Sequence, residues 1–431
     1  MPDSSLSSTA LEQKIIDSIS DLRNTTVDWI IQLVSHPSLL GQEASAQELM
    51  SSFFAEMGLD VEVLEIDENT IRDHAGYSPS LVSYDGRVNI IGRHEPNVQR
   101  GRSLIFNGHI DVVPVGKTEL WTRSPFEPWI DGDRLYGRGS MDMKSGIVAF
   151  MIAYKAIKNL GYLPAAPIIM QSVVEEECTG NGALACLMAG YTADAAIITE
   201  PTSNAPMACQ MGVMWLTIEV EGKPAHAAMA SDGFSAIDLS LKLFDGLKTL
   251  EEYYNGAENR PSCYEHSHKP INFNLGQING GEWASSVPTR CKMDIRVGFY
   301  PGRTTEEVRA ELENCIKEIF EAHPAKANAQ YHITYKGFQA EGCEVDMNGP
   351  MITSLQTAHR DVTGNEPGQC NFTGTTDARF FNLYGGIPAT CYGPTGGEGH
   401  GIDEWVSIDS VIEVSKVLAV FIARWCELDK Q

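Results

Sequence analysis

Residues 168–177 read Ile-Ile-Met-Gln-Ser-Val-Val-Glu-Glu-Glu, so an apolar run leads directly into three carboxylates. A continuous apolar run of this length is typical of a strand that is buried on both faces of a sheet. Similar runs occur at 88–92, 103–106 and 195–199, and a helical pattern at 146–160 lies between two of the runs. Strands that alternate with helices predict an α/β domain with a mainly parallel sheet. Further helices are expected at 11–35, 44–57 and 408–428.

The pattern changes after about residue 209, where a different order of elements begins. Strands are expected at 214–220, 271–278, 290–299 and 331–335, and helices at 234–253 and 304–322. This order of strand, helix, two strands, helix and strand predicts a ferredoxin-like α+β unit inserted into the first domain. We therefore predict a catalytic domain formed by residues 1–211 and 338–431, and a lid domain at 212–337. Residues 254–270 are expected to be a surface excursion of the lid.

Length, net charge and cysteine content indicate what kind of protein this is and which partners are disfavoured. The 431 residues are enough for two or three domains, and 32 basic against 57 acidic side chains give a net charge of −25. This charge argues against nucleic acid and anionic membranes as partners. We find no signal peptide, no membrane span and no C-x-x-C pair among the ten cysteines. A cytoplasmic protein with reduced thiols is therefore expected.

Polar residues with metal-binding chemistry follow the predicted strands. His109 and Asp111 come directly after the run at 103–106, and because they are two apart they share one face of an extended segment. Ligand sites in open α/β sheets form at such strand ends, and a carboxylate can orient a metal-binding histidine. Taken alone, His109 is also compatible with a structural or surface role.

The glycine-rich segment 137–146 carries Asp142 and opens a helix. It matches neither a phosphate-binding loop nor a dinucleotide fingerprint. Asp142 is therefore either a metal-bridging carboxylate or a helix N-cap.

Three further segments add carboxylates and a second histidine. Glu175, Glu176 and Glu177 are adjacent, and three negative charges at the end of a core strand are costly unless a cation compensates them. One glutamate can bind metal while its neighbour transfers protons. Glu200 ends the run at 195–199, and His400 lies in the glycine-rich segment 396–401. Mixed histidine and carboxylate ligands favour zinc, with cobalt or manganese as competitors, and two such ions can activate a water molecule.

Together, five segments resemble the dinuclear zinc family of acetylornithine deacetylase and succinyl-diaminopimelate desuccinylase, which also includes aminoacylase and glutamate carboxypeptidase. These segments are 107–111, 137–146, 174–182, 197–202 and 396–404, and the likeness covers nearly the whole chain. The resemblance implies an α/β catalytic domain with an inserted lid that often mediates dimerisation. A homodimer through the lid is therefore expected.

The resemblance also implies roles for single residues. His109 and Glu200 would bind one metal ion, Glu177 and His400 the other, and Asp142 would bridge the two. Asp111 would orient His109, and Glu176 would be the general base and then the acid that protonates the leaving amine. His226 of the lid would stabilise the oxyanion, in some relatives from the partner subunit.

Four other residues are weaker candidates. Arg296 and Arg379 suit bidentate recognition of a substrate carboxylate, although structural ion pairs are equally compatible with the sequence. Asn274 of the lid is a further substrate-binding candidate, with strand capping as the alternative. Cys178 follows Glu177 directly, and an inert packed thiol is the expected state.

We expect metal-dependent hydrolysis of the amide bond of a small N-acyl amino acid or N-acyl amine. A carboxypeptidase or dipeptidase on the same scaffold is the first alternative, and a non-catalytic binding protein is the second. No Gly-x-Ser-x-Gly segment is present, which disfavours a serine hydrolase.

Overall fold

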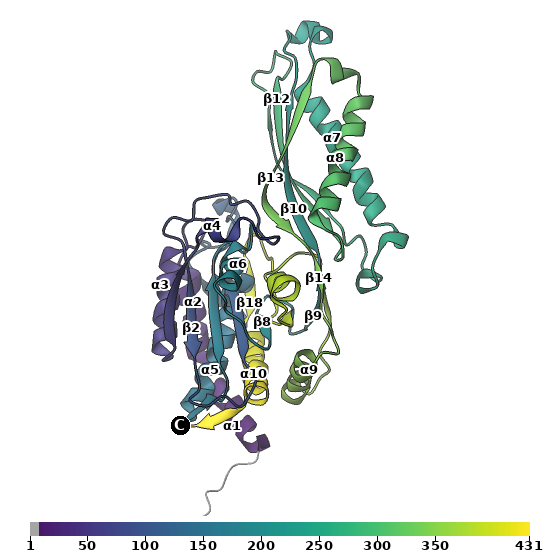
Figure 1. Cartoon of the computed structure of the whole chain (residues 1–431). Helices are drawn as coiled ribbons and strands as arrows, with labels where there is room; N and C mark the ends of the chain where they lie inside the picture. Colours follow the sequence, from purple (N-terminus) through teal and green to yellow (C-terminus); the bar gives the residue numbers. More distant parts are fainter. Residues whose placement is uncertain (1–7) are drawn as a thin grey trace, which may run out of the picture.

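The computed structural model describes residues 8–431 and divides them into two lobes (Figure 1). One lobe holds the main sheet with helices around it, and the other is an elongated sheet with two helices along one side. Each lobe has its own hydrophobic cluster of buried side chains. Within the described residues, no helix combines the length and apolar character needed to cross a membrane.

The main sheet confirms the predicted α/β class. Its six strands lie in the order β1, β2, β7, β3, β8, β16. The pairs β7–β3, β3–β8 and β8–β16 are parallel, whereas β1 and β2 form an antiparallel edge. The strands are β1 (Asp60–Glu65), β2 (Val88–His94), β3 (Leu104–His109), β7 (Ile168–Val173), β8 (Ala196–Ile198) and β16 (Ala389–Cys391).

Helices pack on this sheet and on one another beside it: α3, α5 and α6 contact its strands, and the other helices pack mainly against helices. The helices of this lobe are α1 (Ser8–Asp21), α2 (Arg23–Ser35), α3 (Ala44–Glu56), α4 (Glu68–Ile71), α5 (Ser145–Asn159), α6 (Asn181–Met188), α9 (Pro350–Thr363) and α10 (Ile408–Trp425). The prediction of one helix over 11–35 is wrong, because Leu22 interrupts it and turns the chain. The bend lets α1 pack on α10 and lets α2 reach the turn η2 (Ser140–Lys144). The last helix is shorter than predicted, and Leu428–Lys430 instead forms strand β19 beside β6 (Tyr162–Pro164).

The lid has the predicted ferredoxin-like connectivity. Its strands lie in the order β11, β12, β10, β13, and every neighbouring pair is antiparallel. The elements are β10 (Gly212–Glu221), α7 (Ala236–Tyr254), β11 (Phe273–Gly280), β12 (Arg290–Phe299), α8 (Thr305–Ala322) and β13 (Gln330–Ala340). A capping box at Thr304 and Glu307 begins α8. The domain boundaries at 212 and 337 stay predictions, and β13 runs on to Ala340, where it pairs with Val213.

Two smaller sheets join distant parts of the chain. β9 (Met207–Gln210) pairs with β14 (Cys343–Glu344) and β15 (Cys370–Phe372) at the base of the lid. The other sheet has the order β17 (Gly396–Gly397), β18 (Trp405–Ser407), β5 (Arg134–Tyr136) and β4 (Trp129–Asp131). Because β18 pairs with β5, the loop between β17 and β18 lies beside the segment that follows β5.

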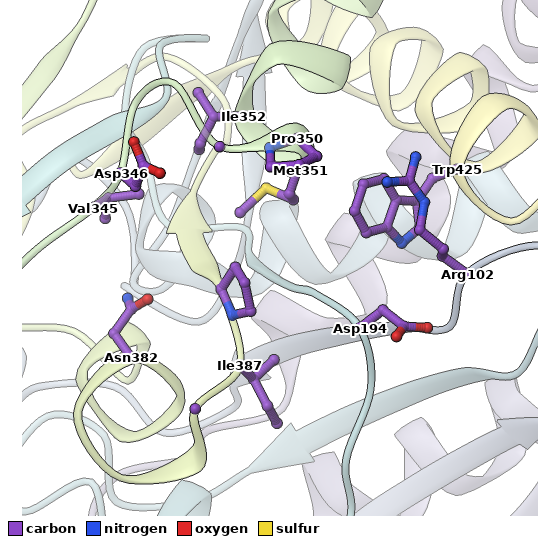
Figure 2. A pocket seen from close by; sticks show the side chains of 13 residues that line it. Arg102, Asp194, Val345, Asp346, Pro350, Met351, Ile352, Asn382, Ile387 and Trp425 are labelled. Carbon is purple, nitrogen blue, oxygen red and sulfur yellow. The ribbon is translucent and has the colours of Figure 1, made fainter.

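A pocket of about 540 Å³ lies where β3, β8 and β16 begin, at the opposite edge from the strand ends singled out in the sequence (Figure 2). Arg102 stacks on Trp425 there, with the guanidinium 3.4 Å from the ring centroid. Asp194 on the same side accepts hydrogen bonds from the amide and hydroxyl of Ser103. No predicted site residue lines this pocket, because the candidate ligands lie at the other edge of the sheet.

We expect Gly146→Ala to lower the free energy of unfolding of the catalytic lobe by about 1–3 kcal/mol. A methyl group at Gly146 would lie 2.0 Å from the backbone oxygen of Thr199, so α5 and the end of β8 would have to separate. Urea denaturation measures the change. Gly368→Ala is the control, because its methyl group would meet Ala205 at an ordinary 3.6 Å. Equal denaturation midpoints for the two variants would contradict this close packing.

Candidate dinuclear metal site

Three neighbouring strands deliver candidate ligands to one edge of the main sheet. His109 is the last residue of β3, Glu176 and Glu177 follow β7, and Glu200 follows β8. Because β3, β7 and β8 are parallel, these side chains emerge at the same edge. The structure therefore brings together residues that are up to 91 positions apart in the chain.

Asp142 lies between two histidines, with one carboxylate oxygen directed to each. Its Oδ1 is 3.0 Å from Nε2 of His109, and its Oδ2 is 3.4 Å from Nε2 of His400. His109 Nε2 is also 3.7 Å from Oε1 of Glu200, and His400 Nε2 is 3.2 Å from Oε2 of Glu177. The two histidines thus lie on either side of a single carboxylate, which a pair of metal ions could share.

Glu176 lies in the same cluster. Its Oε2 is 4.0 Å from Nε2 of His109, and its Oε1 is buried without a hydrogen-bond partner in the described part of the chain. Ligand atoms of His109, Glu176 and Glu200 lie within 4.8 Å of one another, as do those of His109, Asp142 and Glu177. An unpartnered buried oxygen next to nitrogen and oxygen donors fits a site that takes cations and water.

The pKa shifts of the clustered glutamates and histidines also fit a site that binds cations. Burial, together with the charges of neighbouring carboxylates, raises the pKa of Glu176 and of Glu200 well above the ordinary value. Burial alone would lower the pKa of His109, but the hydrogen bond to Asp142 and the charge of Glu200 raise it well above its usual value. The charge of Glu177 and the hydrogen bond to Asp142 raise the pKa of His400 to about 11. Divalent cations bound here would compensate the charge of these buried carboxylates.

Comparison with known proteins gives the family. The model of peptidase family M20/M25/M40 matches residues 105–424. The chain belongs to this family. An N-formyl-4-amino-5-aminomethyl-2-methylpyrimidine deformylase of Bacillus subtilis (strain 168) is 31% identical over 369 residues, which cover 81% of this chain and 85% of that protein.

Solved structures share the fold. The dipeptidase Dug1p of Saccharomyces cerevisiae matches with a TM-score of 0.79 and 13% identity, over 96% of this chain and 98% of that one. A dinuclear metal binding peptidase of the M20 family from Bacillus subtilis matches with a TM-score of 0.62 and 14% identity, over 95% and 99%. These findings confirm the family resemblance, the fold with an inserted lid, and the prediction of a hydrolase that acts on amide bonds.

In this M20 chain the three adjacent glutamates separate into two environments. Glu175 has a left-handed backbone (φ 72°) that turns its side chain into the protein. Its carboxylate accepts hydrogen bonds from Arg87 Nη1 at 2.9 Å and Thr179 Oγ1 at 2.9 Å, and also from the Tyr84 hydroxyl. Arg87 in turn binds Glu43. Glu175 is thus part of a buried ion-pair network. Glu176 and Glu177 instead lie with His109 and Asp142 at the carboxyl edge of the main sheet, which we call the metal edge.

Asp111 holds several parts of the site. Its carboxylate accepts the backbone N–H groups of Glu176 at 3.2 Å and Glu177 at 3.1 Å. The nearest partner of His109 Nδ1 is the backbone oxygen of Asp111 at 2.9 Å, whereas the carboxylate lies 3.7 Å away. Asp111 therefore contacts His109 mainly through its main chain, and its side chain positions the glutamate loop.

The lid candidates lie apart from this cluster. His226 is exposed and its partners are lid residues, Ala228 and Ser286. Arg296 and Asn274 face each other on β12 and β11, and Arg296 donates to the backbone oxygen of Thr373 at 3.4 Å. Their roles in substrate binding stay predictions.

Arg379 is fully buried in the catalytic domain. Its guanidinium donates to the backbone oxygens of Thr179 at 2.6 Å and Thr376 at 3.1 Å, and it lies over the ring of Phe380 at 4.1 Å. These contacts brace the loop after β7. Binding of a substrate carboxylate by Arg379 stays a prediction.

Sequence reasoning missed two acidic residues beside the site. Asp377 is buried with both carboxylate oxygens unpartnered among residues 8–431, and burial raises its pKa to about 6. Glu404 is buried and hydrogen-bonded to the loop that carries Asp142. Asp377 lies two residues before Arg379, and Glu404 ends the segment 396–404, so their acidity near other candidates was the available signal.

We expect Glu175→Gln to lower the free energy of unfolding of the metal-free protein by about 3 kcal/mol, because it breaks a buried ion pair with Arg87. Glu177→Gln is the matched control. It is the same substitution two positions along, at a side chain whose ion-pair partner is His400, and it should lower the free energy far less. Urea denaturation of both variants after metal removal measures the difference. Equal losses would contradict the separate roles of the two glutamates.

Proposed function

We propose that this M20 chain hydrolyses the amide bond of a small N-acyl amine or N-acyl amino acid with two divalent metal ions, zinc being the best match. The position of Asp142 carries the proposal, because its two oxygens face two different histidines. His109 and Glu200 would hold one ion, and Glu177 and His400 the other, with Asp142 shared.

The donor set fits this assignment. Imidazole nitrogens and carboxylate oxygens suit zinc, and cobalt or manganese are the competing ions. When bound, such a pair of ions polarises a carbonyl group and lowers the pKa of water. The chain also supplies a carboxylate with one free oxygen beside the ligands, that of Glu176.

Glu176 is the proposed proton carrier. Its raised pKa suits a group that takes a proton from water and returns it to the leaving nitrogen. The backbone N–H of Glu176 is held by Asp111, which fixes the start of the side chain. His226 would stabilise the oxyanion that forms when water attacks the acyl carbon.

The N-acyl substrate class is supported by the relative that deformylates an N-formyl aminomethylpyrimidine, whose name describes hydrolysis of an N-acyl amine. The alternative is hydrolysis of a dipeptide, the activity named for the structurally similar yeast protein. The two classes differ in the amine that leaves, so substrates can separate them.

We expect the wild-type protein to hydrolyse N-formyl, N-acetyl or N-succinyl amines and amino acids faster than dipeptides. A substrate panel with metal analysis of the same sample measures this.

Glu176→Gln should retain its metal and lose about 10²–10⁴-fold in turnover, the usual contribution of a general base. Preference for dipeptides would replace the deacylase proposal by the alternative, and near-normal turnover of Glu176→Gln would remove Glu176 from the role of base.

We further propose a homodimer in which His226 completes the site of the partner subunit. At about 3.3 Å per residue, the ten residues of β10 span roughly 30 Å, and His226 lies beyond the far end of that strand. Figure 1 shows the lid strands running away from the catalytic lobe. The exposed edge strand β11 and the exposed side chains of Trp283 and Ile278 offer a surface for a second copy.

Complementation tests this arrangement. We expect Glu176→Ala and His226→Ala to be inactive separately and to recover about a quarter of the wild-type activity when they are mixed as exchanged dimers. One of the two sites in each mixed dimer would then have both residues, and half of the dimers are mixed. If His226 acted within its own chain, every site in the mixture would lack one residue and no activity would return.

A further inference from the structure

Glu404 makes several hydrogen bonds to the segment 137–142, which carries Asp142. Its side chain is 1% exposed. One carboxylate oxygen accepts from Arg138 Nη1 at 2.6 Å and from the N–H of Gly139 at 3.1 Å. The other accepts from the N–H groups of Met141 at 2.9 Å and Asp142 at 3.1 Å. All four donors belong to the segment that delivers Asp142.

The main chain of Glu404 adds two contacts to the same segment. Its backbone oxygen accepts from the N–H of Gly137 at 2.9 Å and from the hydroxyl of Ser140 at 3.3 Å. Residues 137–142 are therefore held along their whole length by one residue from the loop between β17 and β18.

Arg138 connects this contact to the second histidine. Its Nη2 donates to the backbone oxygen of Gly401 at 2.9 Å and to that of Pro114 at 3.4 Å. Gly401 is the neighbour of His400, whose Nε2 lies 3.4 Å from Asp142 Oδ2. Movement of either loop would therefore displace the other.

We propose that Glu404 is a positioning residue for the metal site. By accepting the N–H groups of residues 139, 141 and 142, it fixes the position of Asp142 relative to His400. The inference rests on the proposed dinuclear site. Asp142 is the carboxylate that both ligand groups share, so its displacement weakens the binding of both ions. Loss of a residue that orients a metal ligand typically reduces metal affinity by 10–100-fold.

Glu404→Gln tests the proposal, because glutamine keeps the volume and one acceptor but turns an N–H group towards backbone donors. Calorimetric titration of the metal-free protein with Zn²⁺ should give affinities about 10–100-fold weaker than wild type for both ions. Glu12→Gln is the control, since it makes the same change in a doubly hydrogen-bonded pair with Arg424, far from the site. It should bind both ions with wild-type affinity, and thermal unfolding of both variants shows whether they fold.

A purely structural Glu404 would lower the melting temperature and leave the zinc affinities unchanged, and this result would overturn the proposal. Weakening confined to one ion would also overturn it, because the shared ligand would then be undisturbed. Glu404→Asp retains the charge on a shorter side chain and serves if the glutamine variant does not fold. Wild-type affinity in that variant would likewise overturn the proposal. A wild-type protein that binds no zinc would instead refute the dinuclear site itself.

Discussion

Burial of negative charge at the carboxyl edge of the main sheet is the constraint on which the site depends. Seven carboxyl groups in or beside it are buried, those of Glu43, Asp111, Glu175, Glu176, Glu200, Asp377 and Glu404. An uncompensated buried charge costs several kcal/mol. Each of these groups therefore needs a cation, a set of N–H donors or a proton, and the partner that it has indicates its role.

The compensation divides the carboxylates into two sets. Glu175 and Glu43 share Arg87, and Glu404 has Arg138 together with three backbone N–H groups. Donors of the protein itself satisfy these groups, and in the proposal above Glu404 uses them to position the loop that carries Asp142. Burial raises the pKa of Glu176, Glu200 and Asp377, and also that of Asp111 and Glu404, but of these five described residues only Asp111 and Glu404 have carboxylates that accept backbone N–H groups. The unsatisfied set surrounds His109 and Asp142, which is where divalent cations would balance the charge.

The sequence allowed much of this to be predicted. Apolar runs that end in His109, Glu177 or Glu200 are recognisable because a strand buried on both faces has little polar content before its end. The order of strands and helices in the lid could be predicted equally well. What local patterns could not distinguish was Glu175 from its two neighbours, since the difference arises from the backbone turn at Glu175 and from Arg87, 88 positions earlier. The bend at Leu22 could not be predicted for a similar reason, because α1 and α2 keep the same apolar spacing and only their tertiary contacts differ.

The residues proposed for metal binding and those proposed for contact with the substrate lie in different lobes. The five candidate ligands and Glu176 all lie in the catalytic lobe, whereas Asn274, Arg296 and His226 belong to the lid. Since the lid has its own hydrophobic cluster, its surface can change without altering the charge balance at the strand ends. The constraint of buried charge therefore acts on the metal edge alone. This explains why the sequence pattern at that edge is informative about the reaction class, whereas the lid candidates carry no comparable electrostatic signature.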